Sequence, residues 1–282
     1  MKNKTTYSTC AAVVALALST ASAFAGESTK SPNSRLNAKP SLVSSGSGSA
    51  VLEGELGVDV VSGYMFRGTL LDSNLSYQPS LSLRVPIDLS RLGLDKAAVQ
   101  LNTIQAFNQN SPNAGWFRSE VDIGFALSKA GLTLTPSYQL FSSPTSRFQS
   151  AQGFNVRLEY DDSTLTGFKV ALKPYVSGFY GTEGNAANGT SPGSYYEVGV
   201  APTAKIGTTT FSVPFAAGFG TRGYYANNQS HGFTSVGLLA TTPITQNLNF
   251  NAGLRYWQTA ANLNAADAKS MVCTSVGLSL TF

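Results

Sequence analysis

The sequence has little charge, almost no cysteine or histidine, and no long apolar run beyond its first residues. Of 282 residues, 12% are Asp, Glu, Lys or Arg, about half the fraction in ordinary soluble domains. Two cysteines and one histidine exclude a cysteine metal cluster or a disulfide framework. No later stretch approaches the ~20 apolar residues of a spanning helix. Hydrophobic residues nevertheless make up 42% of the chain, which favours many half-apolar strands.

The first 25 residues have the three parts of a secretory signal peptide. Lys2 and Lys4 form a basic start, Ala11–Leu18 is apolar, and Ala23–Ala25 provides a small-x-small cleavage site before Gly26. The apolar part is too short for a stable membrane anchor. We therefore predict that residues 1–25 are removed on export, and that the mature chain begins at Gly26.

Residues 26–50 are rich in Ser, Gly, Pro, Asn and Lys, a composition that buries too little apolar surface to fold. We expect a flexible periplasmic arm, although a segment that enters a pore or touches a partner fits the same composition. Residues 51–282 carry 14 Lys and Arg and 14 Asp and Glu, so the net charge of +4 belongs to the N-terminal part. A neutral folded region and export both argue against a nucleic-acid partner.

From residue 52 onward, apolar and polar residues alternate with a period of two. Between residues 75 and 87, for example, Leu, Tyr, Val and Ile alternate with Ser, Gln and Arg, which sorts them onto two faces of a strand. We count about twelve such segments, with 10–14 as the range, and most have the length of a tilted membrane-crossing strand. Their spans are 52–66, 75–87, 98–108, 117–128, 132–141, 153–161, 168–180, 195–205, 209–219, 233–243, 248–258 and 271–282.

A soluble β-sandwich also alternates, but two features favour an all-β, antiparallel, up-and-down transmembrane barrel over residues 51–282. Tight connections at 128–131, 206–208 and 245–247 alternate with long ones such as 181–193 and 220–232, as in outer-membrane barrels, whose long loops face outside the cell. Aromatic residues gather at strand ends, where two lipid interfaces predict two girdles. At the long-loop end these are Tyr64, Phe66, Tyr77, Phe107, Phe117, Tyr180, Tyr196, Phe219 and Tyr256, and at the other end Tyr160, Phe168, Phe211 and Phe250.

The chain ends on an alternating strand with Phe282 as its last residue. A terminal aromatic residue resembles the assembly signal of bacterial outer-membrane proteins. That resemblance implies the barrel-assembly machinery and outer-membrane lipids as partners and the outer membrane as location. Nothing in the sequence specifies an oligomeric state.

The polar face of each strand should point into the lumen. A barrel of about twelve strands is wide enough for a narrow channel and narrow enough to be filled by side chains. A pore for passive diffusion of small hydrophilic solutes is our first interpretation, because so many charges cost less in water than packed dry. A sealed, salt-bridged interior is the alternative. The pore-lining candidates are Asp59, Arg67, Arg84, Arg118, Glu120, Asp122, Arg157, Lys173, Glu197 and Arg255.

A short stretch resembles a known family. Ser62–Gly68, which reads SGYMFRG, is similar to the Tyr-x-Phe-Arg-Gly stretch near the start of TorF-like outer-membrane porins, which are small barrels with a signal peptide. The resemblance covers the first two strands and implies a porin-like role. On physical grounds we expect Arg67 to face the lumen near the outer mouth, with Gly68 turning the chain.

Two further functions were weighed. An outer-membrane hydrolase needs a nucleophile and a base, yet His231 beside Ser230 in a long loop has no third partner in the sequence. A closed structural or adhesive barrel would bind a surface partner through loops 181–193 and 220–232, the second of which contains Tyr224 and Tyr225. We find no metal-ligand spacing and no cofactor motif, so we expect no enzyme activity, metal or cofactor.

Overall fold

The computed structural model describes residues 52–108, 115–146, 148–164, 170–185, 187, 189–260, 263 and 269–282. The predicted signal peptide and the arm at 26–50 lie outside them. In this part of the chain the strands are β1 (Glu53–Val61), β2 (Tyr64–Phe66), β3 (Thr69–Asp72), β4 (Ser76–Ile87), β5 (Lys96–Asn108), β6 (Gly115–Lys129), β7 (Leu132–Ser142), β8 (Ala151–Tyr160), β9 (Tyr175–Glu183), β10 (Ser194–Val200), β11 (Thr203–Ile206), β12 (Thr209–Ser212), β13 (Phe215–Gly220), β14 (His231–Pro243), β15 (Leu248–Thr259) and β16 (Ser270–Thr281). No helix among these residues is long and apolar enough to cross a membrane.

Twelve antiparallel strands form a closed barrel, as predicted. Each pairs with its neighbours in the chain, and β1 pairs with β16 to close the ring. Two of the twelve are interrupted, because β10 continues as β11 and β12 continues as β13 after Pro202 and Pro214. Proline lacks the N–H that a sheet ladder needs, which accounts for both breaks.

The alternation of the sequence becomes an inside and an outside. On β4, Ser76, Gln78 and Ser80 are buried on the inner face, whereas Leu75, just before the strand, and Val85 are exposed. A chain that crosses lipid must bond every backbone polar group internally, and a closed barrel does so. The large exposed apolar side chains that form the outer surface include Leu56, Val58, Ile123, Phe125, Phe154, Val156, Leu158, Val176, Val198, Leu238, Leu254 and Leu278.

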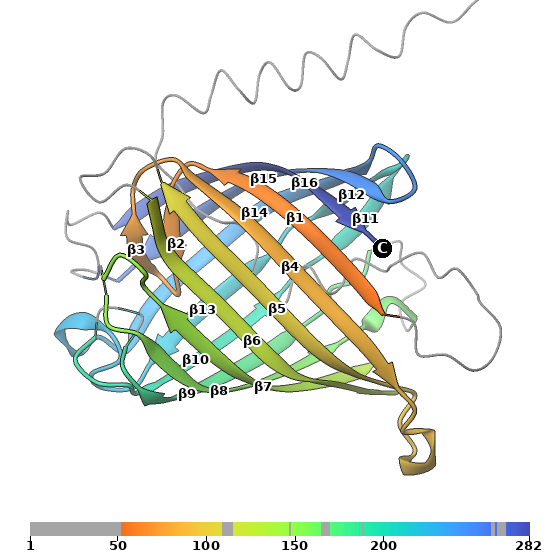
Figure 1. Cartoon of the computed structure of the whole chain (residues 1–282), viewed down its shortest axis with the longest axis horizontal. Helices are drawn as coiled ribbons and strands as arrows, with labels where there is room; N and C mark the ends of the chain where they lie inside the picture. The colour runs from red at the N-terminus through yellow and green to blue at the C-terminus, as the bar shows by residue number, and fades with distance from the viewer. Residues whose placement is uncertain are drawn as a thin grey trace, which may run out of the picture.

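The two ends of the barrel differ, as expected. Short turns at residues 130–131, 207–208 and 244–247 lie at one end, together with the C-terminus and two longer connections, 88–95 and 161–174. Every connection at the other end is longer than those short turns. In Figure 1 the long-loop end is on the left, where β2 and β3 lie, and the C-terminus is on the right. Long loops face outside the cell in barrels of this kind.

Among the described residues of the predicted girdles, three do not face lipid, and Phe168 lies outside the described residues. The first wall strand ends at Val61, not at residue 66, and Tyr64 and Phe66 belong to a separate hairpin, β2–β3, where they are 4% and 8% exposed. In the β5–β6 pair the register shifts between Ala106 and Phe107. This bulge adds a residue to β6 and reverses its alternation, so Phe117 is buried at 1% exposure and the neighbouring Trp116 is exposed.

The first and last strands meet in a seam at the short-turn end. The backbone N–H of Gly54 donates to the Phe282 carbonyl at 2.9 Å, and that of Phe282 donates to the Gly54 carbonyl at 3.0 Å. The Phe282 ring covers Gly54 so closely that a Cβ atom there would lie 2.3 Å from it. Phe282 therefore contributes to closure through both its backbone and its ring.

Candidate functional site

The inside of the barrel is apolar at the long-loop end. A cluster of buried side chains fills it, and none is more than 8% exposed. We call this cluster the aromatic plug. Its members come from the ends of most wall strands, the β2–β3 hairpin and the long loops. They are Tyr64, Met65, Phe66, Ala106, Phe117, Phe141, Ala151, Phe179, Ala187, Tyr195, Ala216, Tyr224, Tyr225, Phe233, Trp257, Leu263 and Cys273.

The β2–β3 hairpin is one part of the plug that does not belong to the wall. Polar contacts fix it at both ends. The Tyr64 hydroxyl donates to Glu120 on β6, and Asn108 on β5 donates to Asp72 at the end of β3. At its turn, Arg67 and Gly68 have φ angles of 51° and 87°. The left-handed conformation costs a non-glycine residue about 1–2 kcal/mol, so Arg67 is held in a strained position.

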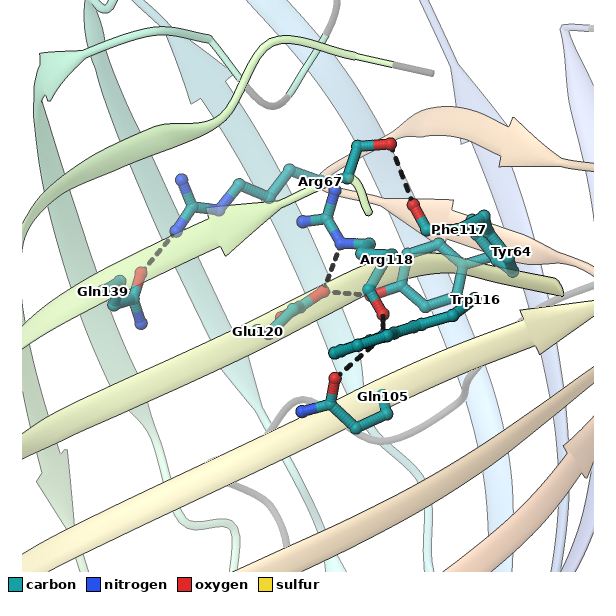
Figure 2. Close-up of polar contacts among 9 residues, drawn as sticks. Tyr64, Arg67, Gln105, Trp116, Phe117, Arg118, Glu120 and Gln139 are labelled. Atoms are coloured by element: carbon teal, nitrogen blue, oxygen red, sulfur yellow. Dashed lines mark hydrogen bonds and ion pairs between the residues drawn. The ribbon is translucent and has the colours of Figure 1, made fainter. Parts of the chain in front are cut away.

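Arg118 lies beside the hairpin and is fixed to the wall. Its Nε donates to Glu120 at 2.6 Å, and the side chain is fully buried. The guanidinium carbon lies 3.9 Å from the Phe66 ring centre and 5.1 Å from that of Phe141. Figure 2 shows Tyr64 and Arg118 converging on Glu120. The direct ion pair holds the Arg118 side chain against its own strand, β6.

Arg67 enters the same region from the hairpin, but its partners are neutral. Its Nη2 donates to Oε1 of Gln139 at 2.8 Å and its Nη1 to the Tyr224 hydroxyl at 2.7 Å. Its guanidinium carbon lies 4.2 Å from the Phe179 ring centre and 4.7 Å from that of Tyr195. A cation over an aromatic face gains about 0.5–2 kcal/mol. The Gln139 contact is drawn in Figure 2.

Toward the short-turn end the interior becomes polar. Glu197 accepts hydrogen bonds from the Tyr175 hydroxyl at 2.7 Å and from the Tyr195 hydroxyl. The Arg157 guanidinium lies 3.6 Å from the Tyr175 ring centre and donates to Glu159 at 2.8 Å. Glu197 is therefore hydrogen-bonded to Tyr195, whose ring contacts Arg67. The Arg157–Glu159 ion pair lies further along the interior.

The other predicted pore residues are spread along the interior. Asp59 is buried on β1 and Arg84 lies on the inner side of β4, whereas Arg255 on β15 lies 5.0 Å from the ring centre of Trp257. Asp122 accepts from Gln139 at 2.7 Å. The list of ten thus contains two close groups and several single charges.

Lys173, like Arg67, is a predicted pore residue that lies outside the strands. It precedes β9 at the short-turn end, with φ at 48°. Both carboxylate oxygens of Asp162 accept backbone N–H groups, from Leu172 and Lys173 at 3.0 Å each. The Lys173 N–H, with that of Leu172, holds the pKa of Asp162 below its ordinary value. Lys173 therefore belongs to a periplasmic turn that its backbone helps to stabilise.

Buried polar atoms without a protein partner mark where water is needed. Within the described residues they include the Gln78 amide on β4, Nε2 of Gln100 on β5 and Ser235 Oγ on β14. Leaving such a group without a hydrogen bond costs about 1–3 kcal/mol. Water molecules inside the barrel would satisfy these inward-facing side chains.

The sequence did not identify Gln139, Phe141, Phe179 and Tyr195 as interior partners of Arg67. The alternation of the sequence could have placed two of them inside, because Gln139 and Phe141 are two residues apart and so lie on the same face of one segment. Gly153 was a further signal: a Cβ there would lie 2.6 Å from the Phe179 ring, so glycine at this position leaves room for that ring.

Two loop predictions were wrong. Tyr224 and Tyr225 are each 1% exposed and belong to the plug, so they are not available to a surface partner. His231 is the first residue of β14, not part of a loop. Its Nε2 lies 3.4 Å from the Thr234 hydroxyl and its ring 5.7 Å from that of Phe219. Neither contact is an acid that could orient a catalytic histidine. The described residues contain no group of three metal-ligating side chains.

Comparison with known proteins shows a fold and no family. No family model and no curated protein sequence matches the chain. Among solved structures, the COG4313 outer membrane channel from Pseudomonas putida F1 aligns with a TM-score of 0.56 and 11% identity, over 84% of this chain and 97% of that one. The NanC porin aligns at 0.48 with 13% identity, over 82% and 100%. Outer membrane phospholipase A from Escherichia coli aligns at 0.43 with 12% identity, over 81% and 92%. The fold comparison rests on the first, and it places the chain among outer-membrane-type barrels.

Proposed function

We propose that the protein is a porin-like channel for passive diffusion of small hydrophilic solutes across the bacterial outer membrane. The observation that supports this most directly is the row of inward polar side chains on β4 and β5 whose amide atoms have no protein partner. Water must satisfy them, and a hydrated interior with wall charges of both signs is all that passive conduction needs.

The aromatic plug sets a condition on this function. Because the plug fills the long-loop end, the hydrated part of the lumen opens toward the short-turn end. Conduction then requires part of the plug to move. We assign this movement to the β2–β3 hairpin, because it is a short element inserted into the lumen and is not a wall strand. The channel we propose is therefore closed at rest and conducts in brief openings.

Single-channel recording in planar bilayers tests the function. Replacing residues 64–72 by a short Gly-Ser turn should raise the mean conductance. Arg84→Gln should then shift the permeability ratio toward cations, and Asp59→Asn toward anions, because each removes one charge from the inner wall. The matched control is His231→Ala on the outer rim, which should leave the ratio unchanged. Absence of channel events with and without the hairpin would contradict the proposal.

A sealed barrel is the second candidate, and the plug itself is the observation that favours it. A sealed barrel would give no conductance in either form, so the same recordings separate the two. Catalysis has no comparable support, because the described contacts of His231 are a hydroxyl and a ring.

Export and assembly complete the proposal. Residues 1–25 would direct secretion, and the Phe282 strand would be recognised by the barrel-assembly machinery before insertion among outer-membrane lipids. The SGYMFRG stretch supports membership of the TorF-like porins. It forms the start of the inserted hairpin, so a shared motif there would mean a shared plug.

A further inference from the structure

The two arginines beside the plug are held in different ways. Arg118 is bonded through its Nε to a carboxylate of its own strand at 2.6 Å, and its two Nη atoms have no hydrogen-bond partner among the described residues. The described polar partners of the Arg67 guanidinium are a neutral amide and a tyrosine hydroxyl. A buried guanidinium with a carboxylate partner is costly to remove. One held by rings and neutral acceptors exchanges more readily.

The wall contains most of the site that holds Arg67. Gln139 and Phe141 come from β7, Phe179 from β9 and Tyr195 from β10, and the three ring centres lie 4.2–5.3 Å from the guanidinium carbon. We call these four residues the wall cage. Only Phe66, at 4.8 Å, would leave with the hairpin.

Two carboxylates stand behind the wall cage without touching the guanidinium in the described contacts. Asp122 accepts from Nε2 of Gln139 at 2.7 Å, which turns Oε1 of the amide toward Arg67. Glu197 accepts from the Tyr195 hydroxyl. Both hydrogen bonds move negative charge toward the cage. Aromatic faces, an oriented carbonyl and remote carboxylates are what recognise a planar or alkylated cation.

We propose that the wall cage is a binding site for guanidinium-type cations, and that Arg67 occupies it as a built-in competitor that holds the hairpin in the lumen. A solute carrying such a group displaces Arg67, takes its place on the wall and frees the hairpin to shift. A site made of rings and neutral acceptors suits a channel, where a solute must bind and then leave. This inference rests on the proposed function for its effect on conduction, but the binding site exists independently of conduction.

The strained turn supports exchange. Arg67 has φ at 51°, a conformation that only its contacts maintain. The Arg67 carbonyl also accepts from the Tyr225 hydroxyl at 2.8 Å. When the guanidinium leaves the wall cage, the turn loses the contacts that hold its side chain, and the strain favours release.

The binding test uses the full mature chain folded in detergent, with Arg67→Ala to empty the wall cage. Methylguanidinium should raise the thermal midpoint of Arg67→Ala in a saturable way, and urea, a neutral molecule of similar shape, should not at the same millimolar concentrations. Arg255→Ala is the matched control, because it removes an interior guanidinium that lies over a single described ring. It should show no such shift. A double variant, Arg67→Ala with Phe179→Leu, should lose most of the stabilisation.

The conduction test follows in planar bilayers. Methylguanidinium should increase the open time of the wild-type channel several-fold and should block the current of Arg67→Ala, with urea inert in both. If Arg67→Ala binds methylguanidinium no better than Arg255→Ala in detergent, the cation site is refuted, whatever the bilayer shows. If binding is observed and no variant conducts, the cation site stands and the proposed channel function fails.

Discussion

Gly54 at the barrel seam allows the role of the last residue to be tested without altering it. Gly54 and Gly178 both lie on the outer face of wall strands. A Cβ at Gly178 would meet only the Tyr196 ring, at an ordinary 3.6 Å, whereas a Cβ at Gly54 would lie 2.3 Å from the Phe282 ring. Gly54→Ala and Gly178→Ala are therefore the same chemical change in two settings that differ in one contact.

The expected energies follow from that difference. Alanine in a strand is more stable than glycine by about 0.5–1 kcal/mol, so Gly178→Ala should stabilise the barrel by that amount. Gly54→Ala has the same gain but forces the Phe282 ring off the strand, and the lost cross-strand contact costs about 0.2–1 kcal/mol. We expect Gly54→Ala to be near neutral and less stabilising than Gly178→Ala. The two variants should differ by the lost contact, about 0.2–1 kcal/mol, which is at most about fivefold in the folding equilibrium.

Urea titration of folding into lipid vesicles measures both variants, with the heat-modifiable band as the readout for folded barrel. A third protein, Phe282→Ala, completes a double-mutant cycle with Gly54→Ala. In the Phe282→Ala background, Gly54→Ala should become stabilising like Gly178→Ala, because no ring remains to be displaced. If Gly54→Ala has the same effect with and without the ring, the ring–glycine contact does not contribute to closure.

The remaining predictions concern the ends, the wall and a turn. Deleting Phe282 should lower the yield of heat-modifiable barrel with unchanged synthesis, as shown by immunoblot; normal yield would make the ending incidental. In a cysteine-free background, a cysteine at Leu254 should resist a water-soluble thiol reagent and one at Arg255 should react, and equal labelling would reject the inside–outside assignment. Asp162→Asn should reduce the loss of stability that the wild type shows as pH falls below about 4, because a lowered pKa stabilises the fold only while the carboxylate is charged. An unchanged acid profile would show that the backbone hydrogen bonds of Asp162 contribute little. The intact mass of the protein purified from outer membranes should match a chain that begins at Gly26, and a mass that includes residue 1 would exclude the cleavage site.

The wall of the barrel was predictable because lipid and water impose one rule on every strand. Each of the twelve segments overlaps a wall strand, and the last, 271–282, differs from β16 by one residue at each end. Apolar and polar residues alternate with a period of two wherever one face of a strand meets lipid. This rule does not depend on which strands are neighbours, so a single sequence is enough to apply it.

The plug was not predictable by the same rule. Tyr64 and Phe66 alternate in phase with the first wall strand, and aromatic residues at a strand end are also what a lipid interface selects. Only the turn at Ser62–Gly63 separates the two outcomes. At Phe117 a one-residue bulge reversed the alternation, and a bulge has no signature in composition. The sequence thus places Arg67 inside, but not the rings and the amide that surround it.

The composition of the plug has a consequence for the order of biogenesis. Its side chains come from β5 through β10, from β13 to β16 and from the hairpin after β1, so the sequence separation between its parts spans almost the whole barrel. Contacts of such long range form late in folding, since chain ends must first be brought together. The plug therefore has no complete surface to pack against until β1 has paired with β16. We therefore expect a newly inserted barrel to pass through a stage at which its wall is closed and its hairpin has not yet docked. At that stage the plug would not yet separate the two sides of the membrane.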